Sequence, residues 1–175
     1  MNQFQDEIFC KVNGYEKYEI SNFGTIKNCK TGRILKQNFT GAEGNQYYSV
    51  NLSFKGKVKS HSIHVLVALA FCENPDGEPC VDHRDNDKTN NMYDNLRWCQ
   101  YLQNNMSKLK TTKPTSSRYK GVSFAKHRNK FVAYIAIHGK NKNLGGFENA
   151  VDAAKKYDQF AREHYREFAK PNFNL

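Results

Sequence analysis

The stretch Val81-Asp82-His83-Arg84-Asp85-Asn86-Asp87-Lys88-Thr89-Asn90-Asn91 places carboxylates, an imidazole and amides together in one short polar segment. The chain continues with Asn95-Leu96-Arg97-Trp98 and then, six residues after the tryptophan, with Asn104. Folding alone gives little reason to crowd such groups together. Hydrolysis of a phosphodiester, in contrast, needs a cation held by oxygen ligands beside a neutral imidazole that accepts a proton. The segment therefore indicates a hydrolytic site.

The side chains of this segment suit a hard divalent cation. Asp82 and Asn104 offer oxygen donors, and neither a thiolate nor a second imidazole is near in the sequence, so we expect one Mg²⁺ or Mn²⁺ ion and no zinc. His83, with an ordinary imidazole pKa of about 6.5, is neutral at pH 7 and is the expected general base.

An ordinary loop is the alternative explanation of the segment. Asn86, Asn90 and Asn91 are good turn residues, and an Asp-His pair ahead of an asparagine-rich turn needs no chemistry by itself. A turn does not explain the later Asn95-Leu96-Arg97-Trp98 and Asn104. Their spacing favours the site.

The cysteines and the N-terminal residues indicate the cellular compartment. Five cysteines, at positions 10, 29, 72, 80 and 99, stand singly, without the two-residue spacing of zinc knuckles. Because the first residues lack the basic and apolar regions of a signal peptide, we expect reduced thiols and a cytoplasmic protein. The longest apolar run, within residues 63–72, is shorter than the roughly 18 to 20 residues that span a bilayer, so no membrane partner is expected.

The opening segment resembles the core of the HNH endonucleases of the homing-endonuclease branch, which carry Asp-His, then Asn-Leu-x-Trp, then a polar ligand on the following helix. The resemblance implies a two-stranded ribbon and a helix around one divalent cation, with double-stranded DNA against the ribbon. It implies Asp82 and Asn104 as the metal ligands, and Asn104 is preferred to Asn105 because it stands six residues after Trp98. It also implies that the Asn95 amide ties the ribbon loop together and orients His83. Arg97 is expected to approach the scissile phosphate, which completes a predicted catalytic set of His83, Asn95 and Arg97.

The first third of the chain has the pattern of a small antiparallel sheet. Turn signals such as Asn13-Gly14 and Lys55-Gly56 separate short β-prone runs between residues 13 and 59. The string Gly14-Tyr15-Glu16-x-Tyr18-Glu19-Ile20-Ser21-Asn22-x-Gly24 also resembles the nuclease-associated modular (NUMOD-type) motif that often precedes this kind of HNH core. That motif usually opens with a tryptophan, and here Phe9 is the nearest upstream aromatic.

Residues 62–71 are expected to form a buried helix behind the ribbon. They combine helix-forming residues with a possible Ser62 N-cap, and Asn74-Pro75 follows as a stop signal. The run is apolar on nearly every side. His64 within it is expected to be a hydrogen-bonded structural histidine and not a metal ligand, because the metal spacing is met downstream.

The net charge of +10 lies entirely in the last part of the chain. Residues 1–107 hold 12 Lys and Arg against 12 Asp and Glu, whereas residues 108–175 hold 15 against 5. Between Asp94 and Glu148 there is no acidic residue, and aromatic residues such as Tyr119 and Tyr134 alternate with the basic ones. This pattern is typical of a nucleic-acid-binding surface. The alternative is a solvated, lysine-rich face.

The sequence of the C-terminal part predicts three strands followed by a helix. In the middle strand, the alternate residues 131, 133, 135 and 137 are expected to face the helix, and residues 132, 134, 136 and 138 are expected to face outward. The helix has Ala150, Ala153, Ala154, Tyr157, Ala161 and Tyr165 on one face. Residues 117–173 resemble the APETALA-type, or ethylene-response-factor-type, DNA-binding domain, in the Tyr119-Lys120-Gly121-Val122 opening, the Leu-Gly-x-Phe strand, the Ala-Ala-x-x-Tyr-Asp helix and the Ala-x-x-Asn-Phe close. Ser123, Ala136 and Asn143 stand where plant members carry Arg, Arg and Trp, so we expect mostly phosphate contact. The expected DNA contacts are Lys120, Lys126, Arg128, Lys130, Tyr134, His138, Lys140 and Lys142.

These patterns together predict an α+β protein with a small antiparallel β N-terminal region, a ββα-metal HNH core and a separate sheet with one helix. The expected divisions are residues 1–60, 61–107, a linker at 108–117, and 118–175. The expected function is a metal-dependent DNA endonuclease of the homing type, in a phage- or bacterium-like host cell, with a monomer favoured. The alternative is a DNA-binding regulator built on an inactive HNH scaffold. Target sequence and nick versus double-strand cleavage are not encoded in any visible pattern.

Overall fold

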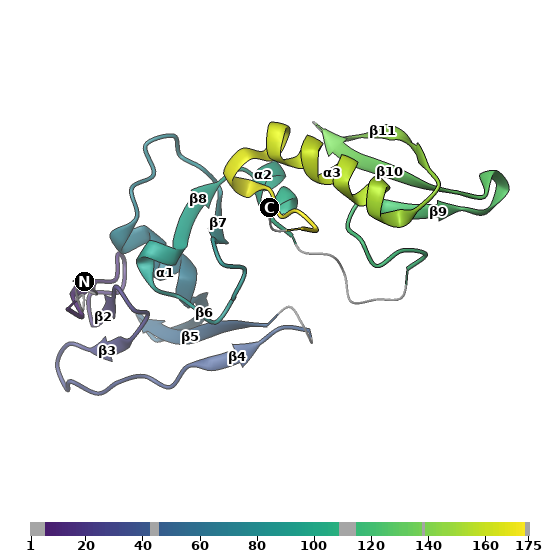
Figure 1. Cartoon of the computed structure of the whole chain (residues 1–175). Coiled ribbons are helices and arrows are strands. Elements are labelled where there is room, and N and C mark those ends of the chain that lie inside the picture. Colours follow the sequence, from purple (N-terminus) through teal and green to yellow (C-terminus); the bar gives the residue numbers. More distant parts are fainter. Residues whose placement is uncertain (1–5, 43–45, 109–114, 138, 174–175) are drawn as a thin grey trace. The chain divides into compact units, whose positions relative to one another are not determined.

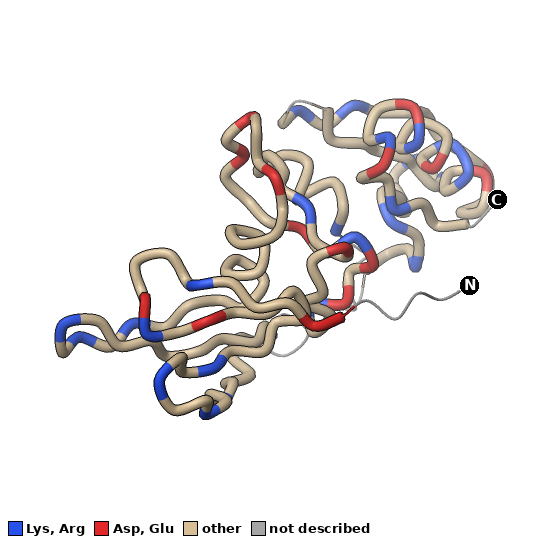
Figure 2. Tube along the Cα trace, turned by 90° about the vertical axis from the view of Figure 1, so that its left-hand side faces the viewer, with Lys and Arg blue, Asp and Glu red and all other residues tan. Residues whose placement is uncertain are grey.

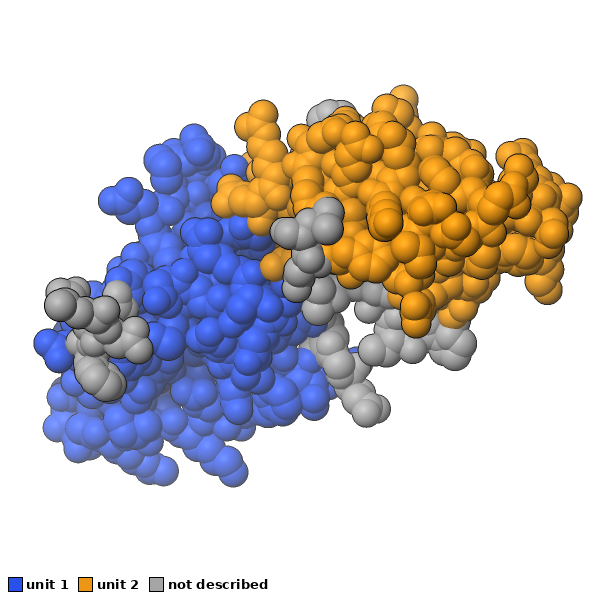
Figure 3. All heavy atoms as spheres, viewed as in Figure 1, with its two compact units in different colours: residues 1–99 blue, residues 100–175 orange. Residues whose placement is uncertain are grey.

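The computed structural model describes residues 6–42, 46–108, 115–137 and 139–173. The chain forms two compact units, Met1–Cys99 and Gln100–Leu175, which Figure 3 shows in two colours. The boundary between them falls inside the segment 61–107 that was expected to form one nuclease core. The finer predicted division, with a linker at 108–117, stays a prediction.

The first unit begins with two three-stranded antiparallel sheets (Figure 1), where the turn signals predicted one small antiparallel sheet. Neighbouring strands in the sequence pair with each other in both sheets. The first sheet contains β1 (Phe9–Lys11), β2 (Tyr18–Ser21) and β3 (Ile26–Asn28), and the second contains β4 (Asn38–Thr40), β5 (Tyr47–Phe54) and β6 (Lys57–Ser62).

Helix α1 (Ile63–Phe71) is the centre of this unit. Ile63 and Val67 are fully buried and share a core with Ile20 of β2 and Leu52 of β5. Leu69 is 64% exposed, so the expectation of burial on nearly every side was wrong, because sheets and ribbon cover only part of the helix. Ser62 stands at the N-cap without a side-chain capping bond.

The polar segment lies on a two-stranded antiparallel ribbon that packs on α1. Strand β7 (Cys80–His83) pairs with β8 (Leu96–Cys99), in a register that sets Asp82 opposite Arg97. A 3₁₀ turn, η1 (Tyr93–Asn95), leads into β8. The Trp98 indole N–H donates to the Cys72 carbonyl over 3.2 Å and so ties β8 to the end of α1. Helix α2 (Tyr101–Met106) follows, and the order of two strands and a helix is the expected one.

The second unit contains a three-stranded antiparallel sheet, of order β11-β10-β9, covered by one long helix. The alanines at 153, 154 and 161 are completely buried, so the predicted small-residue face does pack on the sheet. The strands are β9 (Val122–Ala125), β10 (Lys130–Ile137) and β11 (Lys140–Phe147), the helix is α3 (Ala150–Tyr165), and two 3₁₀ turns are η2 (Lys126–Arg128) and η3 (Arg166–Phe168). No helix in the described parts of either unit is long and apolar enough to cross a membrane.

The alternation predicted for β10 holds only in part. Ala133 and Ile135 are buried and Tyr134 and Ala136 are exposed, as expected. Val132 was expected to face outward, and it is only 2% exposed. The pairing of β10 with β11 shifts register between Ala133 and Tyr134, where Leu144 is the extra residue on the β11 side. His138, the last residue of the expected outward set, lies outside the described residues.

A buried carboxylate binds the C-terminal segment to the helix of the second unit. Asp158 of α3 is 1% exposed and accepts hydrogen bonds from the backbone N–H groups of Asn172 and Phe173, at 2.7 and 2.9 Å. The Asn172 side-chain amide also donates to Asp158, over 2.9 Å, and its oxygen accepts from the Lys120 backbone N–H, over 2.6 Å. Asp158 therefore joins the helix, the C-terminal segment and the start of the sheet.

We predict that Asp158→Ala lowers the stability of the second unit by about 3–5 kcal/mol, because three partly buried donors lose the charged acceptor that is itself buried. Asp152→Ala, at the exposed start of the same helix, is the matched control and costs about 1 kcal/mol or less. Urea unfolding with hydrogen exchange of α3 peptides measures both changes. Equal losses in the two variants would contradict the assignment.

Candidate active site

The ribbon holds a buried ion pair. Arg97 Nη2 and Nε lie 2.7 and 3.0 Å from Asp82 Oδ2, and both side chains are only 7% exposed. The cross-strand register, which brings residues fifteen apart face to face, positions this pair. A buried carboxylate needs such compensation. The guanidinium thus fixes the carboxylate that the sequence proposes as a metal ligand, and the phosphate contact expected of Arg97 stays a prediction.

His83 is buried beside this pair, at 4% exposure. Its Nε2 lies 3.3 Å from Asn91 Oδ1. Burial lowers the pKa of His83 below the ordinary imidazole value, while the hydrogen bond with Asn91 and the nearby carboxylates, Asp85 first, act in the opposite direction. The ring is therefore neutral at pH 7, which is the form that accepts a proton.

Asn95 bridges the loop between the two strands. Its Nδ2 donates to Asp85 Oδ1 and to the Asn90 carbonyl, both over 2.9 Å, and its Oδ1 accepts from the Asp85 backbone N–H over 3.1 Å. The backbone carbonyl of Asn95 also accepts from the Arg84 N–H over 2.8 Å. This is the loop-tying arrangement expected of Asn95. The residue that contacts the His83 ring, however, is Asn91.

Two more rings lie against His83. The His64 ring centroid is 5.1 Å from that of His83, and the Tyr47 ring is 5.0 Å from His64 and 6.1 Å from His83. His64 was expected to be hydrogen-bonded, but its buried Nδ1 has no hydrogen-bond partner among the described residues. The sequence missed Tyr47 and Asn91, because one looked like an ordinary strand residue and the other like a turn residue.

Asn104, the second predicted ligand, lies on α2 and is half-buried. Helix α2 belongs to the second unit, so the ribbon and the last residue of the motif are in different units. The C-terminal end of α2 is closed by a side chain from that unit: Lys120 Nζ donates to the Met106 carbonyl over 2.9 Å and to the Lys108 carbonyl over 2.5 Å. Burial, with repulsion from Lys170, lowers the pKa of Lys120 to about 8. The ammonium is thus used inside the unit, and its DNA contact stays a prediction.

The other described basic residues predicted to meet DNA are exposed on η2, β10 and β11. Lys130 forms a 3.0 Å ion pair with Glu148, and Lys142 lies 5.0 Å from the Phe160 ring centroid. Figure 2 marks the Lys and Arg positions of both units. The exposed set comprises Lys126, Arg128, Lys130, Tyr134, Lys140 and Lys142.

Comparison with known proteins connects this geometry to a family. The NUMOD4 motif matches residues 7–53. DNA endonuclease I-HmuI of Bacillus phage SP01 is 38% identical over 101 residues, which are 55% of this chain and 56% of that protein. The solved structure described as "DNA binding and cleavage by the HNH homing endonuclease I-HmuI" superposes with a TM-score of 0.52 at 27% identity, covering 85% of this chain and 82% of the other.

The chain is a relative of the HNH homing endonucleases and carries a NUMOD4 motif. An uncharacterized HNH endonuclease, L245, of Acanthamoeba polyphaga mimivirus is 40% identical over 94 residues, covering 54% of this chain and 27% of the relative. The chain spans between 23% and 56% of the length of the first curated relatives it matches.

A plant protein is also similar to part of the chain. APETALA2-like protein 2 of Oryza sativa is 40% identical over 60 residues, which are 34% of this chain and 14% of the plant protein. The match is partial, and it supports the resemblance noted for the C-terminal segment.

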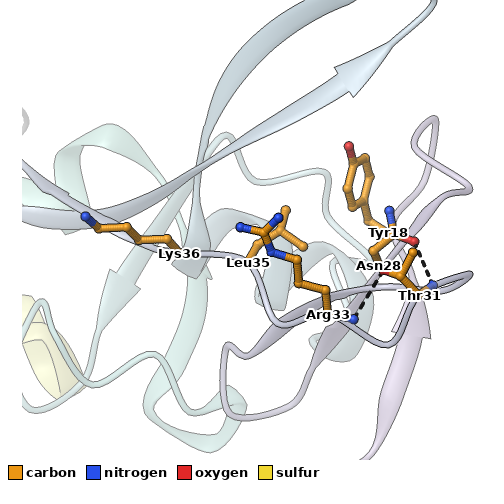
Figure 4. Close-up of a pocket in the computed structure, with 6 residues that line it drawn as sticks. All are labelled: Tyr18, Asn28, Thr31, Arg33, Leu35 and Lys36. Atoms are coloured by element: carbon orange, nitrogen blue, oxygen red, sulfur yellow. Dashed lines mark hydrogen bonds between the residues drawn. The ribbon is translucent and has the colours of Figure 1, made fainter.

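A hollow in the first unit is separate from the ribbon. Figure 4 shows its lining side chains, which come from β2, β3 and the segment after β3. The hollow shares no residue with the segment from Asp82 to Asn95, so it is not the candidate active site. The lining residues are Tyr18, Asn28, Thr31, Arg33, Leu35 and Lys36.

The burial of His64 predicts a pH dependence of stability. Desolvation, helped by His83, lowers the pKa of His64 to about 4 in the folded chain, from 6.5. The unfolded chain therefore binds more protons between these values, and stability falls as the pH drops from 6.5 towards 4. We predict that His64→Gln reduces this acid loss by roughly 2 kcal/mol. Urea unfolding at pH 7 and pH 4.5 measures the acid loss of stability, and His164→Gln, at an exposed position of α3, is the control. An equal acid loss of stability in the two variants would refute the prediction.

Proposed function

We propose that the chain is a metal-dependent DNA endonuclease that hydrolyses phosphodiester bonds, of the homing type found in its relative I-HmuI. The observation that carries the proposal is the neutral, buried His83 imidazole next to Asp82 on the ribbon, in a chain whose fold is similar to that of an HNH homing endonuclease. One such site acts on one strand at a time, so a single chain acting alone introduces a nick.

Asp82 and Asn104 would hold the cation. A carboxylate oxygen and an amide oxygen fit Mg²⁺ or Mn²⁺. The five cysteines are all free thiols, and none stands in this donor set. When bound, the cation supplies positive charge that stabilises the leaving 3′ oxygen.

His83 acts on the attacking water. The imidazole takes one proton from the water, the water oxygen forms a bond to phosphorus, and the bond from phosphorus to the 3′ oxygen breaks with its electron pair on that oxygen. A proton from solvent completes the 3′ hydroxyl, and the phosphate remains on the 5′ end. Asn95 holds the loop that carries the base, and Arg97 holds the Asp82 carboxylate in place.

The second unit would bind the DNA backbone. It contains 15 basic residues and only 5 acidic ones. The exposed lysines on η2, β10 and β11 suit phosphate contact. The small side chains at Ser123 and Ala136, where plant proteins of this type carry arginine, favour weak or different sequence preference.

A specific observation favours the alternative, a DNA-binding regulator with an inactive HNH scaffold. Asp82 already has a buried partner in Arg97, and an ion pair can hold a carboxylate for stability alone. Under this alternative the chain binds DNA and leaves a supercoiled plasmid intact at any Mg²⁺ or Mn²⁺ concentration.

We predict that the purified chain, with Mg²⁺ or Mn²⁺, nicks or linearises a supercoiled plasmid that carries the DNA flanking its own gene. His83→Ala is expected to lower the rate by at least about 10³-fold and to change DNA affinity by less than about twofold, because a general base acts only in the reaction. His164→Ala, on exposed α3, serves as the control and retains the rate. Cleavage by His83→Ala at the original rate would sink the assignment.

We predict that each of Lys126→Gln and Lys140→Gln lowers the slope of log affinity against log salt by about 0.9, because one phosphate contact is lost. Lys155→Gln removes the same charge from the exposed face of α3 and is expected to leave the slope unchanged. Fluorescence anisotropy between about 50 and 200 mM salt measures the slopes. A shared slope for all three variants and the parent chain would argue for a merely solvated basic face.

A further inference from the structure

Asn91 presents its oxygen to His83. Its Oδ1 is 3.3 Å from His83 Nε2, and both side chains are buried, at 6% and 4% exposure. The Nδ2 group of Asn91 donates to the Thr89 carbonyl over 3.2 Å. Because an amide has its donors on one atom and its acceptor on the other, this bond turns Oδ1 towards His83. Nε2 of the neutral ring must then carry the hydrogen, and the lone pair lies on Nδ1.

A turn in the N-terminal motif packs directly against Asn91. Gly24 has a φ of +90°, and a Cβ placed on it would lie 3.2 Å from Asn91 Cβ and 3.0 Å from Ile63 Cγ2. Both the backbone conformation and the lack of space require glycine here. The turn therefore touches the side chain that touches the candidate base.

The same turn also holds the backbone that follows Asn91. The Tyr93 N–H donates to the Asn22 carbonyl over 2.9 Å. The Asn22 side chain is itself fixed, since its Oδ1 accepts a hydrogen bond from the Ile8 N–H over 2.9 Å. Within the turn, Ser21 Oγ accepts a hydrogen bond from the Thr25 N–H over 2.9 Å. The loop from Asn91 to Tyr93 thus rests on a turn that its own hydrogen bonds make rigid.

We infer that Asn91 is a positioning residue that holds the His83 ring with Nδ1 as the proton acceptor, and that the turn of residues 21–25 keeps Asn91 in place. The N-terminal motif then supports the active-site loop in addition to any contact with DNA. The effect on cleavage rests on the proposed function, whereas the state of the ring does not.

Two measurements on the full chain test the inference. The first is the single-turnover rate of plasmid cleavage at saturating protein, beside DNA affinity. Asn91→Ala is expected to slow cleavage about tenfold or more with affinity within about twofold, and Asn91→Asp, which keeps an acceptor oxygen, to recover most of the rate. Gly24→Ala is expected to slow cleavage several-fold, and the double variant to be no slower than Asn91→Ala alone, because the two changes act through one contact.

The second measurement is the ¹⁵N NMR spectrum of the imidazoles without DNA or metal. The parent chain is expected to show His83 with its hydrogen on Nε2, and Asn91→Ala and Gly24→Ala to show a mixture of tautomers. Gly14→Ala is the matched control: Gly14 has a φ of +74° in the same motif, but a Cβ there meets nothing within 4 Å, so it carries the backbone strain without the contact. Its spectrum and rate are expected to match the parent's.

The outcomes separate the two hypotheses. A parent chain that never cleaves refutes the proposed function, and the spectra then decide the positioning role alone. Unchanged tautomers in Asn91→Ala, or independent effects of Gly24→Ala and Asn91→Ala on the rate, overturn the inference. If Gly24→Ala does not fold, Asn22→Ala takes its place, because it removes the side-chain bond that fixes the turn.

Discussion

The antiparallel pairing of β7 with β8 is the constraint on which the site depends. It places Asp82 opposite Arg97, and the register admits no slip, since a shift of one strand by one residue would turn its charge to the other face and leave the other charge unpaired. The ion pair then fixes the carboxylate, and His83 follows as the next residue of the same strand. Helix α1 packs against both strands of the ribbon.

Much of the fold was visible in the sequence, because the residues that determine it have short-range signals. The ribbon, the helix after Ser62 and the alanine face of α3 all follow from spacing within a few residues. The failures come from tertiary contacts. Val132 is buried although the alternation of its strand predicts an outward position, and Leu69 is exposed because only one side of α1 is covered.

The candidate site was predicted less completely than the fold. Asp82, His83 and Asn95 stood out because carboxylates, imidazoles and amides rarely gather without chemistry. Asn91 did not, since an asparagine in a turn is common, and only the folded loop shows its oxygen facing His83. The Lys120 ammonium donates hydrogen bonds to two backbone carbonyls that only folding brings near it. No local sequence pattern predicts these bonds.

The close approach of Gly24 to Asn91 bears on how such proteins are assembled from parts. A motif that recurs next to nuclease cores suggests a cassette that recombination moves freely between genes. Here the N-terminal motif and the core meet at Gly24 with no room for a side chain. An exchange of the N-terminal segment alone would join surfaces that were never fitted to each other, so a productive exchange has to carry the loop around Asn91 with it.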